Sequence, residues 1–415
     1  MAIASESART AFDAGLEEFR RAARHFLEAN VSRRAKRTGP ADFGIGDDSV
    51  EVFPTLVESD ERARLERVSS WQRLKFDAGF GAITWPDEYG GRGLPGRFEQ
   101  AFRSEEAAFD TPEPTELFAV TVGLVAPTIS VHGNDELRRR FIRKLLRTDL
   151  FACQLFSEPG AGSDLASVAS RADRDGNGWV LNGQKVWTSG AQFASIGEAI
   201  CRTDRSVPKH EGMTAFLVPM DAPGVEIRPI RQMTGGSSFN EVFLNDVRVP
   251  DANRLGAEGK GWKVARTTLG FERASSQHAN PGGSFRRVLD LARHLGCTDD
   301  PVIRQELARV YIGSRLIKYT GLRVQAGMRN RQTPGPEGSI RKLLWVENLT
   351  RTGELAARIL GPRITADTGE WGTYAWSAHL LGAPGYHIAG GSDEIQRNII
   401  GERVLGLPPE PRETR

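Results

Sequence analysis

The chain has 415 residues, 39% of them hydrophobic, and this length predicts two or three domains, each able to bury a core. Its 55 Lys and Arg residues nearly balance its 53 Asp and Glu residues, so the net charge of +2 does not predict nucleic-acid binding. Three widely spaced cysteines exclude a disulfide framework, and without an apolar run of about 18 residues or a signal segment we expect a soluble, cytoplasmic protein.

Residues 1–150 are predicted to form a helical domain. Apolar residues from Phe12 to Phe26 recur at spacings of three and four, which places them on one helical face. A Gly- and Asp-rich stretch at 39–48 breaks this pattern, and Ser59 is the expected N-cap of the next helix. Gly- and Pro-rich residues 81–96 interrupt the helices again before further helix to about Leu150.

Residues 151–258 change to short β-like runs separated by turn residues. Because no helices lie between the runs, they indicate an antiparallel sheet or barrel. Asn182-Gly183 is a strong hairpin signal and Asn245-Asp246 a weaker one. The predicted strands are 151–156, 178–189, 214–220, 225–230 and 239–250.

Residues 259–415 return to helix and complete an α–β–α order. Three long amphipathic segments cover 284–295, 300–328 and 339–360. Asp300-Pro301 is expected to begin the second, and the stretch Pro334–Gly338 separates it from the third. The third carries more apolar positions than one bundle face needs, so we expect it at a subunit interface.

Several common catalytic motifs are missing. No GxGxxG follows a strand, and no Walker A, HExxH, GxSxG or EF-hand pattern occurs. The seven histidines are scattered without a helical i,i+4 pair, so no metal site is predicted. His387 is expected to be a hydrogen-bonded loop histidine.

Three segments have the composition of a binding site. FSEPGAGSD, Phe156–Asp164, is either an ordinary turn or a loop whose glycines let a ligand approach its N–H groups. In KVWTSG, Lys185–Gly190, Trp187 is either part of the core or a wall for a planar ring. In AGGSDEIQR, Ala389–Arg397, Ser392 is either a helix N-cap or part of an anion site.

Together with ITWPDEYGGRGLP, FNEVFLNDVRVP and IIGERVLGLP, these segments resemble the acyl-CoA dehydrogenase family over nearly the whole chain. The resemblance implies an α+β fold with an N-terminal all-α domain (1–150), a middle antiparallel β-domain (151–258) and a C-terminal four-helix bundle (259–415). It also implies FAD, an acyl-CoA substrate and an electron-transferring flavoprotein as partner. The expected assembly is a homotetramer, or a heterotetramer with a related chain.

The resemblance carries site roles to individual residues. Trp187 matches an aromatic wall on one flavin face, and Ser189 matches the hydroxyl that bonds the flavin near N5. Substrate contacts fall on Ser163, Arg273 and Gly391. The cofactor contacts that it implies are Gln154, Phe156, Ser157, Gly162, Ser163, Trp187, Ser189, Ser392, Asp393 and Glu394.

One position departs from the commonest family pattern. Where that pattern has its catalytic glutamate, this chain has Gly390, which has no carboxylate. A second family pattern carries the base as the Glu of a Glu-Arg pair on an earlier helix, which matches Glu272-Arg273; the alternative for Glu272 is a surface acid. We therefore expect Glu272 to take the α-proton while the β-hydride goes to the flavin, and the Gly390 N–H to bind the thioester carbonyl.

Other departures leave alternatives open. The family's Arg-x-x-Phe-Gly segment is missing from 292–305, and its Gly-rich FAD loop is changed at Arg358–Pro362, so the ADP half of FAD is expected to be held differently. A non-catalytic subunit of a mixed tetramer is one alternative to a dehydrogenase, and a flavin monooxygenase or acyl-CoA oxidase relative is another. The motifs do not choose between fatty and sterol side-chain acyl groups.

Overall fold

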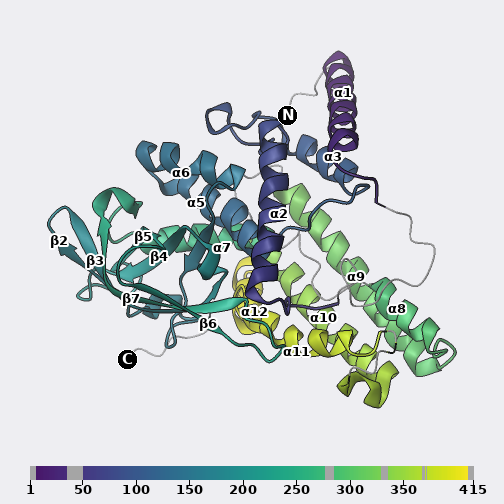
Figure 1. Cartoon of the computed structure of the whole chain (residues 1–415). Helices are drawn as coiled ribbons and strands as arrows, with labels where there is room; N and C mark the ends of the chain where they lie inside the picture. The colour runs from purple at the N-terminus through teal and green to yellow at the C-terminus, as the bar shows by residue number, and fades with distance from the viewer. Residues whose placement is uncertain are drawn as a thin grey trace.

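The computed structural model describes residues 6–34, 50–275, 285–328, 335–366, 370 and 372–409. Helices come first, then a sheet, then a second set of helices (Figure 1), as the sequence predicts. The predicted break at 39–48 lies outside the described residues. None of the described helices combines the length and the apolar character needed to cross a bilayer.

The first helices bury the periodic apolar face that the sequence predicts. Phe19 and Leu27 of α1 (Glu6–Asn30) lie in an aromatic core. The prediction that Ser59 caps the next helix is wrong, because α2 begins at Glu58 after Val57, and acidic side chains in its first turn complement the free N–H groups instead. The helices that follow are α3 (Gly96–Glu106), α4 (Glu116–Val120), a π-helical turn (Thr121–Val125), α5 (Ala126–His132) and α6 (Asp135–Arg147).

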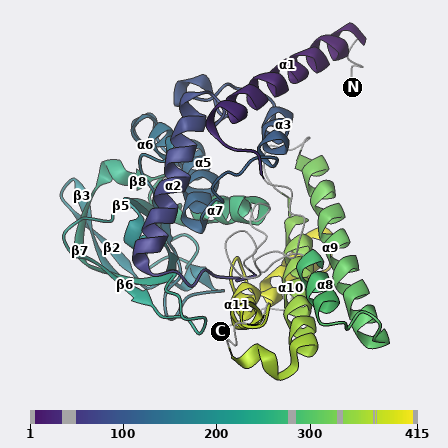
Figure 2. The ribbon, with the colours of Figure 1, turned by 45° about the vertical axis from the view of Figure 1, so that its right-hand side comes forward.

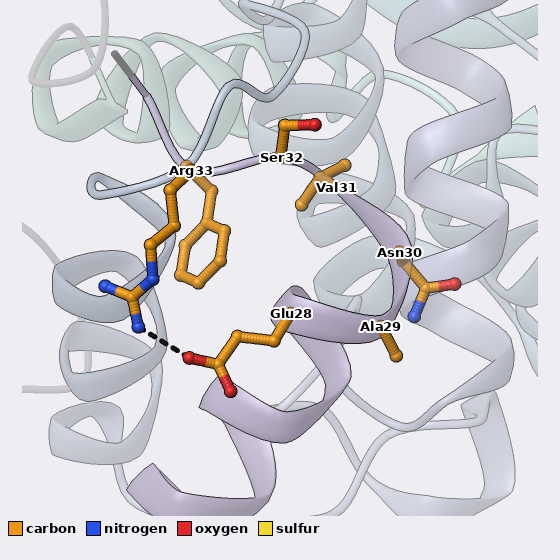
Figure 3. A pocket seen from close by; sticks show the side chains of 7 residues that line it. Glu28, Ala29, Asn30, Val31, Ser32 and Arg33 are labelled. Atoms are coloured by element: carbon orange, nitrogen blue, oxygen red, sulfur yellow. Dashed lines mark hydrogen bonds and ion pairs between the residues drawn. The ribbon is translucent and has the colours of Figure 1, made fainter. Parts of the chain in front are cut away.

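A hollow lies beside the C-terminal end of α1 (Figure 3). Residues 28–33 and Phe109 border it, and an ion pair from Arg33 Nη2 to Glu28 Oε1, 2.5 Å long, crosses it. None of the site residues implied by the resemblance lines this hollow. It therefore belongs to the packing of α1 and not to the candidate site.

Eight strands form one mixed sheet in the order β6-β7-β3-β2-β4-β5-β8, with β1 paired to β4 off this path. Most neighbours are antiparallel, as predicted, but β1 pairs with β4 in parallel and β2 meets β4 in parallel at one position. The strands are β1 (Ala152–Leu155), β2 (Arg171–Asp175), β3 (Gly178–Ser189), β4 (Ile196–Arg202), β5 (Met213–Pro219), β6 (Val225–Ile230), β7 (Phe239–Pro250) and β8 (Arg254–Leu255).

Neither predicted hairpin turn is a turn. β3 continues through Asn182-Gly183 and β7 continues through Asn245-Asp246, where the register between the two strands shifts. The two irregular points face each other, because Asn182 Nδ2 donates to Asp246 Oδ1 at 3.0 Å. The turn between β2 and β3 contains Gly176, with φ +55°. The residues that favour hairpins here form one bulge, in which Asn245 and Asp246 of β7 stand opposite the single residue Asn182 of β3.

β4 was not predicted from the sequence. All of its residues are buried, so it lacks the alternation that marks a half-exposed strand. Its neighbour β1 is buried in the same way apart from Gln154. These two strands form the centre of the sheet region that faces the helices.

The C-terminal helices begin with α7, which lies between the sheet and the other helices in both views (Figures 1 and 2). The prediction that Asp300 starts α9 is confirmed, since its Oδ1 accepts from the N–H groups of Val302 (2.7 Å) and Ile303 (3.1 Å). The helices are α7 (Gly261–Ser275), α8 (Phe285–His294), α9 (Pro301–Met328), α10 (Gly338–Leu360), α11 (Ala375–Ile388) and α12 (Asp393–Ile399).

The exposed apolar side chains of these helices lie on α9 and α11 and not on α10. The helix expected at an interface, α10, packs against α8, α9, α11 and α12, and none of its large apolar side chains is exposed. α9 instead exposes a stripe of apolar side chains at helical spacing. This α9 stripe consists of Tyr311, Ile312, Leu316, Tyr319 and Leu322.

Candidate active site

The two residues that the sequence singles out for catalysis meet in space. Glu272 is half-buried near the end of α7, and Gly390 lies in the turn between α11 and α12. A Cβ atom added to Gly390 would lie 3.3 Å from Glu272 Oε1, and apart from its chain neighbours no other atom of the described residues would lie within 4 Å of it. The carboxylate of Glu272 therefore borders the space that a side chain at position 390 would enter.

The turn that carries Gly390 needs glycine twice. Gly390 has φ +67° and Gly391 has φ +88°, both in the left-handed region that other residues rarely adopt. Gln396 Nε2 donates to the carbonyl oxygens of Gly390 (2.9 Å) and Gly391 (3.1 Å). Within the described residues neither glycine N–H donates a hydrogen bond, so the turn offers both as donors to a ligand.

Asp393, an expected cofactor contact, fastens this turn to the rest of the protein. Its Oδ1 accepts from Lys342 Nζ at 3.0 Å and its Oδ2 lies 2.6 Å from His387 Nδ1. His387 Nε2 lies 2.8 Å from Thr350 Oγ1, so the predicted hydrogen bonding is present, but the prediction of a loop is wrong because His387 lies in the last turn of α11. Burial opposes ionisation of Asp393, but the bonds from His387 and Lys342 hold its pKa below the usual value. Both carboxylate oxygens thus have protein partners.

The start of α12 uses its polar residues locally. Ser392 Oγ accepts from the Ile395 N–H at 3.5 Å, which makes Ser392 the N-cap. Glu394 is exposed in the first turn. Of the two interpretations of Ser392, the N-cap is therefore the one that the structure contains.

A buried ion pair holds the loop Phe156–Asp164. Lys185 Nζ is fully buried and contacts Glu158 Oε1 at 2.7 Å, and it also donates to the carbonyl of Ile200 at 2.7 Å. The Glu158 carboxylate also accepts from the N–H groups of residues 169 and 170. Burial alone would raise the pKa of Glu158, but the charge of Lys185 and these bonds lower it. The loop is therefore held at Glu158 and by Ala161, which is in the core, while Gly160, Gly162 and Ser163 stay exposed.

The tip of this loop has room for a ligand. Cβ atoms added to Gly160 or Gly162 would meet nothing within 4 Å among the described residues, so contacts with that part of the chain do not explain these glycines. Ser163 is exposed beside them. The side chain of Phe156 is in the core instead. This open backbone fits a group that approaches closely from outside, such as a cofactor.

Trp187 is an exposed aromatic residue on a strained backbone. Its side chain is 60% exposed, and its φ of +61° is rare for a residue other than glycine. It lies where the register between β3 and β7 shifts between Lys185 and Thr188. The core interpretation of Trp187 is therefore wrong, and a strained, exposed ring on a bulge is a common feature of binding sites.

Ser189 is part of a polar group that joins three segments. Its hydroxyl donates to Glu116 Oε1 at 3.0 Å, at the start of α4. Solvent still reaches Glu116, but the protein around it desolvates the carboxyl and raises its pKa. Burial, with the nearby charge of Glu116, also raises the pKa of Tyr386 on α11. The hydroxyl of Ser189, the carboxyl of Glu116 and the phenol of Tyr386 thus lie near one another.

Sequence reasoning missed Glu116 and Lys342 because neither belongs to a motif. Each obtains its partner from a segment far along the chain, so no local signal marks it. Gln154 is half-buried on β1, and the side chain of Arg273 lies outside the described part of the structure. In the described ranges, no three His, Cys, Asp or Glu side chains are grouped to hold a metal ion.

Comparison with known proteins identifies relatives along most of the chain. Sequence models of the acyl-CoA dehydrogenase N-terminal, middle and C-terminal domains match residues 49–149, 153–247 and 259–405. Acyl-CoA dehydrogenase IpdE1 of Mycobacterium tuberculosis is 41% identical over 356 residues, which are 85% of this chain and 91% of that protein.

Two solved structures share the fold. One, named Tcur3481-Tcur3483 steroid ACAD, is 26% identical with a TM-score of 0.73, over 96% of this chain and 98% of that one. A chain of the ChsE4-ChsE5 complex from Mycobacterium tuberculosis is 27% identical with a TM-score of 0.71, over 99% of this chain and 100% of that one.

Proposed function

Because the chain belongs to the acyl-CoA dehydrogenase family of flavoprotein oxidoreductases, we propose that it catalyses α,β-dehydrogenation of an acyl-CoA thioester to the 2-enoyl-CoA. The observation that carries this proposal is the Glu272 carboxylate beside Gly390. A non-catalytic subunit would not need a carboxylate beside Gly390, the position where the commonest family pattern has its catalytic glutamate.

Glu272 is the proposed general base. It reaches the turn 389–392 from α7, where a substrate held by that turn presents its α-carbon. A base must come within hydrogen-bond reach of the proton that it removes. Because Gly390 has no side chain, the space beside it admits both the Glu272 carboxylate and a substrate carbon.

The N–H of Gly390 is the proposed donor to the thioester carbonyl. A donor at that oxygen stabilises the enolate charge that develops when the α-proton leaves. The turn is held in shape before the reaction by Gln396 on the glycine carbonyls and by the contacts of Asp393. The donor and the base thus come from different segments and do not compete for one residue.

The residues fit FAD as the cofactor. Ser157, Gly162 and Ser163 would hold it along the open loop, while Trp187 would cover the ring and Ser189 would bond its edge. When bound, FAD supplies the hydride acceptor for the β-carbon. We further propose that an electron-transferring flavoprotein reoxidises the enzyme and that the chain works in the cytoplasm as part of a tetramer.

For the acyl group we propose a steroid-derived thioester over a straight fatty chain. The support is the likeness to two structures named steroid ACAD, which covers 96% of this chain at 27% and 26% identity. Anaerobic reduction by a panel of CoA thioesters tests this choice. A straight-chain thioester that reduces the protein faster than every steroid-derived one contradicts it.

The central experiment is anaerobic reduction of the purified yellow protein, followed as loss of the oxidised-flavin absorbance. Glu272→Gln keeps the shape of the side chain but not its basicity, so reduction should slow by roughly 10²- to 10⁴-fold while FAD and acyl-CoA still bind. Glu258→Gln, an exposed acid on the surface, is the matched control and should be nearly silent. If Glu272→Gln reduces the flavin at the wild-type rate, Glu272 is not the base. If the purified protein is colourless, the non-catalytic subunit is favoured.

A further inference from the structure

A carboxyl group is buried beneath α7, where its neighbours on β4 and β5 are apolar and its partner on β1 is Gln154. Glu198 on β4 is 0% exposed. Along the same face of β4 it lies between Ile196 and Ile200, and across the sheet it pairs with Leu217 of β5. The mechanism proposed above does not use Glu198, and packing alone would favour a leucine at this position.

The contacts of Glu198 join three parts of the protein. Thr268 Oγ1 on α7 donates to Glu198 Oε1 at 2.7 Å, and the same hydroxyl lies 3.0 Å from Thr128 Oγ1 on α5. The strand comes from the region matched by the middle-domain model, α7 from the C-terminal region and α5 from the N-terminal region. Glu198 Oε2 has no hydrogen-bond partner among the described residues.

The neighbouring residue of α7 is fastened as well. Thr267 Oγ1 lies 2.8 Å from His132 Nε2 at the end of α5. Two adjacent threonines therefore tie α7 to both of the elements beneath it. Glu272 follows Thr268 by four residues, which places it on the same side of α7 and about 6 Å farther along the helix axis.

Polar contacts of this kind specify one arrangement of a helix. Apolar side chains tolerate a small slide or rotation of α7, whereas a hydrogen bond to a buried carboxyl is lost when the helix moves. Burial raises the pKa of Glu198 to about 8, so the group carries its proton at neutral pH. A neutral carboxyl fits a site without a cation.

We propose that Glu198 is a positioning residue that acts through Thr268 to hold α7 in the register that places Glu272 beside Gly390. This inference rests on the proposed role of Glu272 as the base. Glu198 itself touches neither substrate nor cofactor. Its effect is on the rate of proton removal, because a misplacement of about 1 Å at a reacting group can cost about 10²-fold in rate.

The test compares two replacements of similar size. Glu198→Leu fills the volume without an acceptor for Thr268, and Glu198→Gln keeps an acceptor. We expect Glu198→Leu to slow anaerobic flavin reduction by roughly 10- to 100-fold, with acyl-CoA affinity and melting temperature at or above wild type. Glu198→Gln should stay close to the wild-type rate. Wild-type reduction by Glu198→Leu, or equal damage in both variants, overturns the proposal.

Thr268→Val tests the same contact from the helix side and guards against misfolding of the Glu198 variants. It should slow reduction as Glu198→Leu does. In the Glu272→Gln background, Glu198→Leu should cause no further slowing, because its effect passes through Glu272. If Glu272→Gln is slow while both Glu198→Leu and Thr268→Val reduce at the wild-type rate, only the positioning role fails. If Glu272→Gln itself reduces the flavin at the wild-type rate, the role of Glu272 as the base in the proposed function is contradicted.

The pH profile is a second readout that a purely structural role would not change. Above pH 8 Glu198 ionises. Its bond from Thr268 favours the charged form, but the cost of burying the charge is larger, so α7 should be displaced and reduction should decline in wild type but not in Glu198→Gln. The charged and titratable groups on the packed elements are His132 on α5 and Lys263, Arg266, Glu272 and Arg273 on α7. β1 carries the buried thiol of Cys153 beside the uncharged Gln154, and β5 contributes the uncharged Leu217. The same decline in Glu198→Gln overturns the assignment.

Discussion

Two regions of the β-domain each bury a glutamate, and one of these carboxyl groups is ionised while the other is neutral. In the loop region, Glu158 meets the ammonium of Lys185 and two backbone N–H groups, so its pKa is lowered despite burial. Beneath α7, Glu198 meets a single hydroxyl, and burial raises its pKa to about 8. Burial alone does not decide whether a carboxyl is charged; the partners that the fold brings to it do.

The difference has a functional side. The charged pair holds a loop whose tip is open, and the neutral carboxyl holds a helix that carries the proposed base. An ion pair is strong enough to fix a loop from one end, because both partners lose much if either moves. A neutral hydrogen bond fixes a helix that is already held by apolar contacts on several sides.

The largest effect on stability is expected when the ion pair between Lys185 and Glu158 is broken. Lys185→Met leaves Glu158 ionised or forces it to take up a proton in a buried site, so the free energy of unfolding should fall by about 3 to 5 kcal/mol. Urea unfolding at pH 7 measures this. Adding Glu158→Gln to Lys185→Met should recover a large part of the loss, and no recovery would show that packing of the lysine chain matters more than charge.

The next effect concerns pH and has opposite signs in the two regions. The raised pKa of Glu198 gives stability that is fully present below its unfolded value and is lost as pH rises towards 8. Between pH 5 and 8 the wild type should therefore lose about 3 kcal/mol relative to Glu198→Gln. The lowered pKa of Glu158 gives stability that is lost as pH falls below its unfolded value. Parallel pH curves for wild type and Glu198→Gln would contradict the neutral carboxyl.

A smaller effect contrasts the glycines of the two regions. Alanine at Gly390 is strained at φ +67° and crowds Glu272, so Gly390→Ala should lower stability by about 1 to 2 kcal/mol and slow flavin reduction. Alanine at Gly162 meets no atom of the described residues within 4 Å, so Gly162→Ala should leave the melting temperature of the apoprotein unchanged and weaken FAD retention. Ultrafiltration with flavin absorbance measures retention. Equal melting losses in both variants would refute the contrast.

A substitution in the α9 stripe is expected to have the smallest effect on the stability of the two regions. Leu316→Asp places a charge on exposed apolar surface, so it should lower the assembly state while the stability of the folded chain changes little. Light scattering gives the mass in solution, and Arg309→Asp elsewhere on α9 serves as a charge control. A monomeric wild type at micromolar concentration would rule out this interface.

Local sequence signals predicted much of the fold. The periodic helices, the Asp300 cap of α9 and the order of helices, strands and helices depend on neighbouring residues, and all are present. The signals that failed were also local. Asn182-Gly183 favours a turn, but in the sheet Asn182 stands opposite a bulge of β7 and bonds to Asp246 there. β4 shows no alternation because both of its faces are covered.

Sequence motifs identified the candidate site residues, but they did not identify the side chains that contact those residues in the folded chain. The resemblance implied Glu272 and Gly390, and only the folded chain places them against each other. Asp393 was expected to touch the cofactor, yet Lys342 and His387 occupy both of its oxygens. Trp187 had two interpretations in the sequence, and its exposure decided between them.

What the sequence alone determined is therefore what a few consecutive residues can encode: periodicity, caps and the order of motifs. What only the tertiary structure decided is the chemical state of single groups. Thr268 is 70 residues from Glu198 and 140 from Thr128, so the bond that defines Glu198 exists only when α5, α7 and β4 pack together. Desolvation and hydrogen bonding act through space, and for that reason no local pattern distinguishes the charged Glu158 from the neutral Glu198.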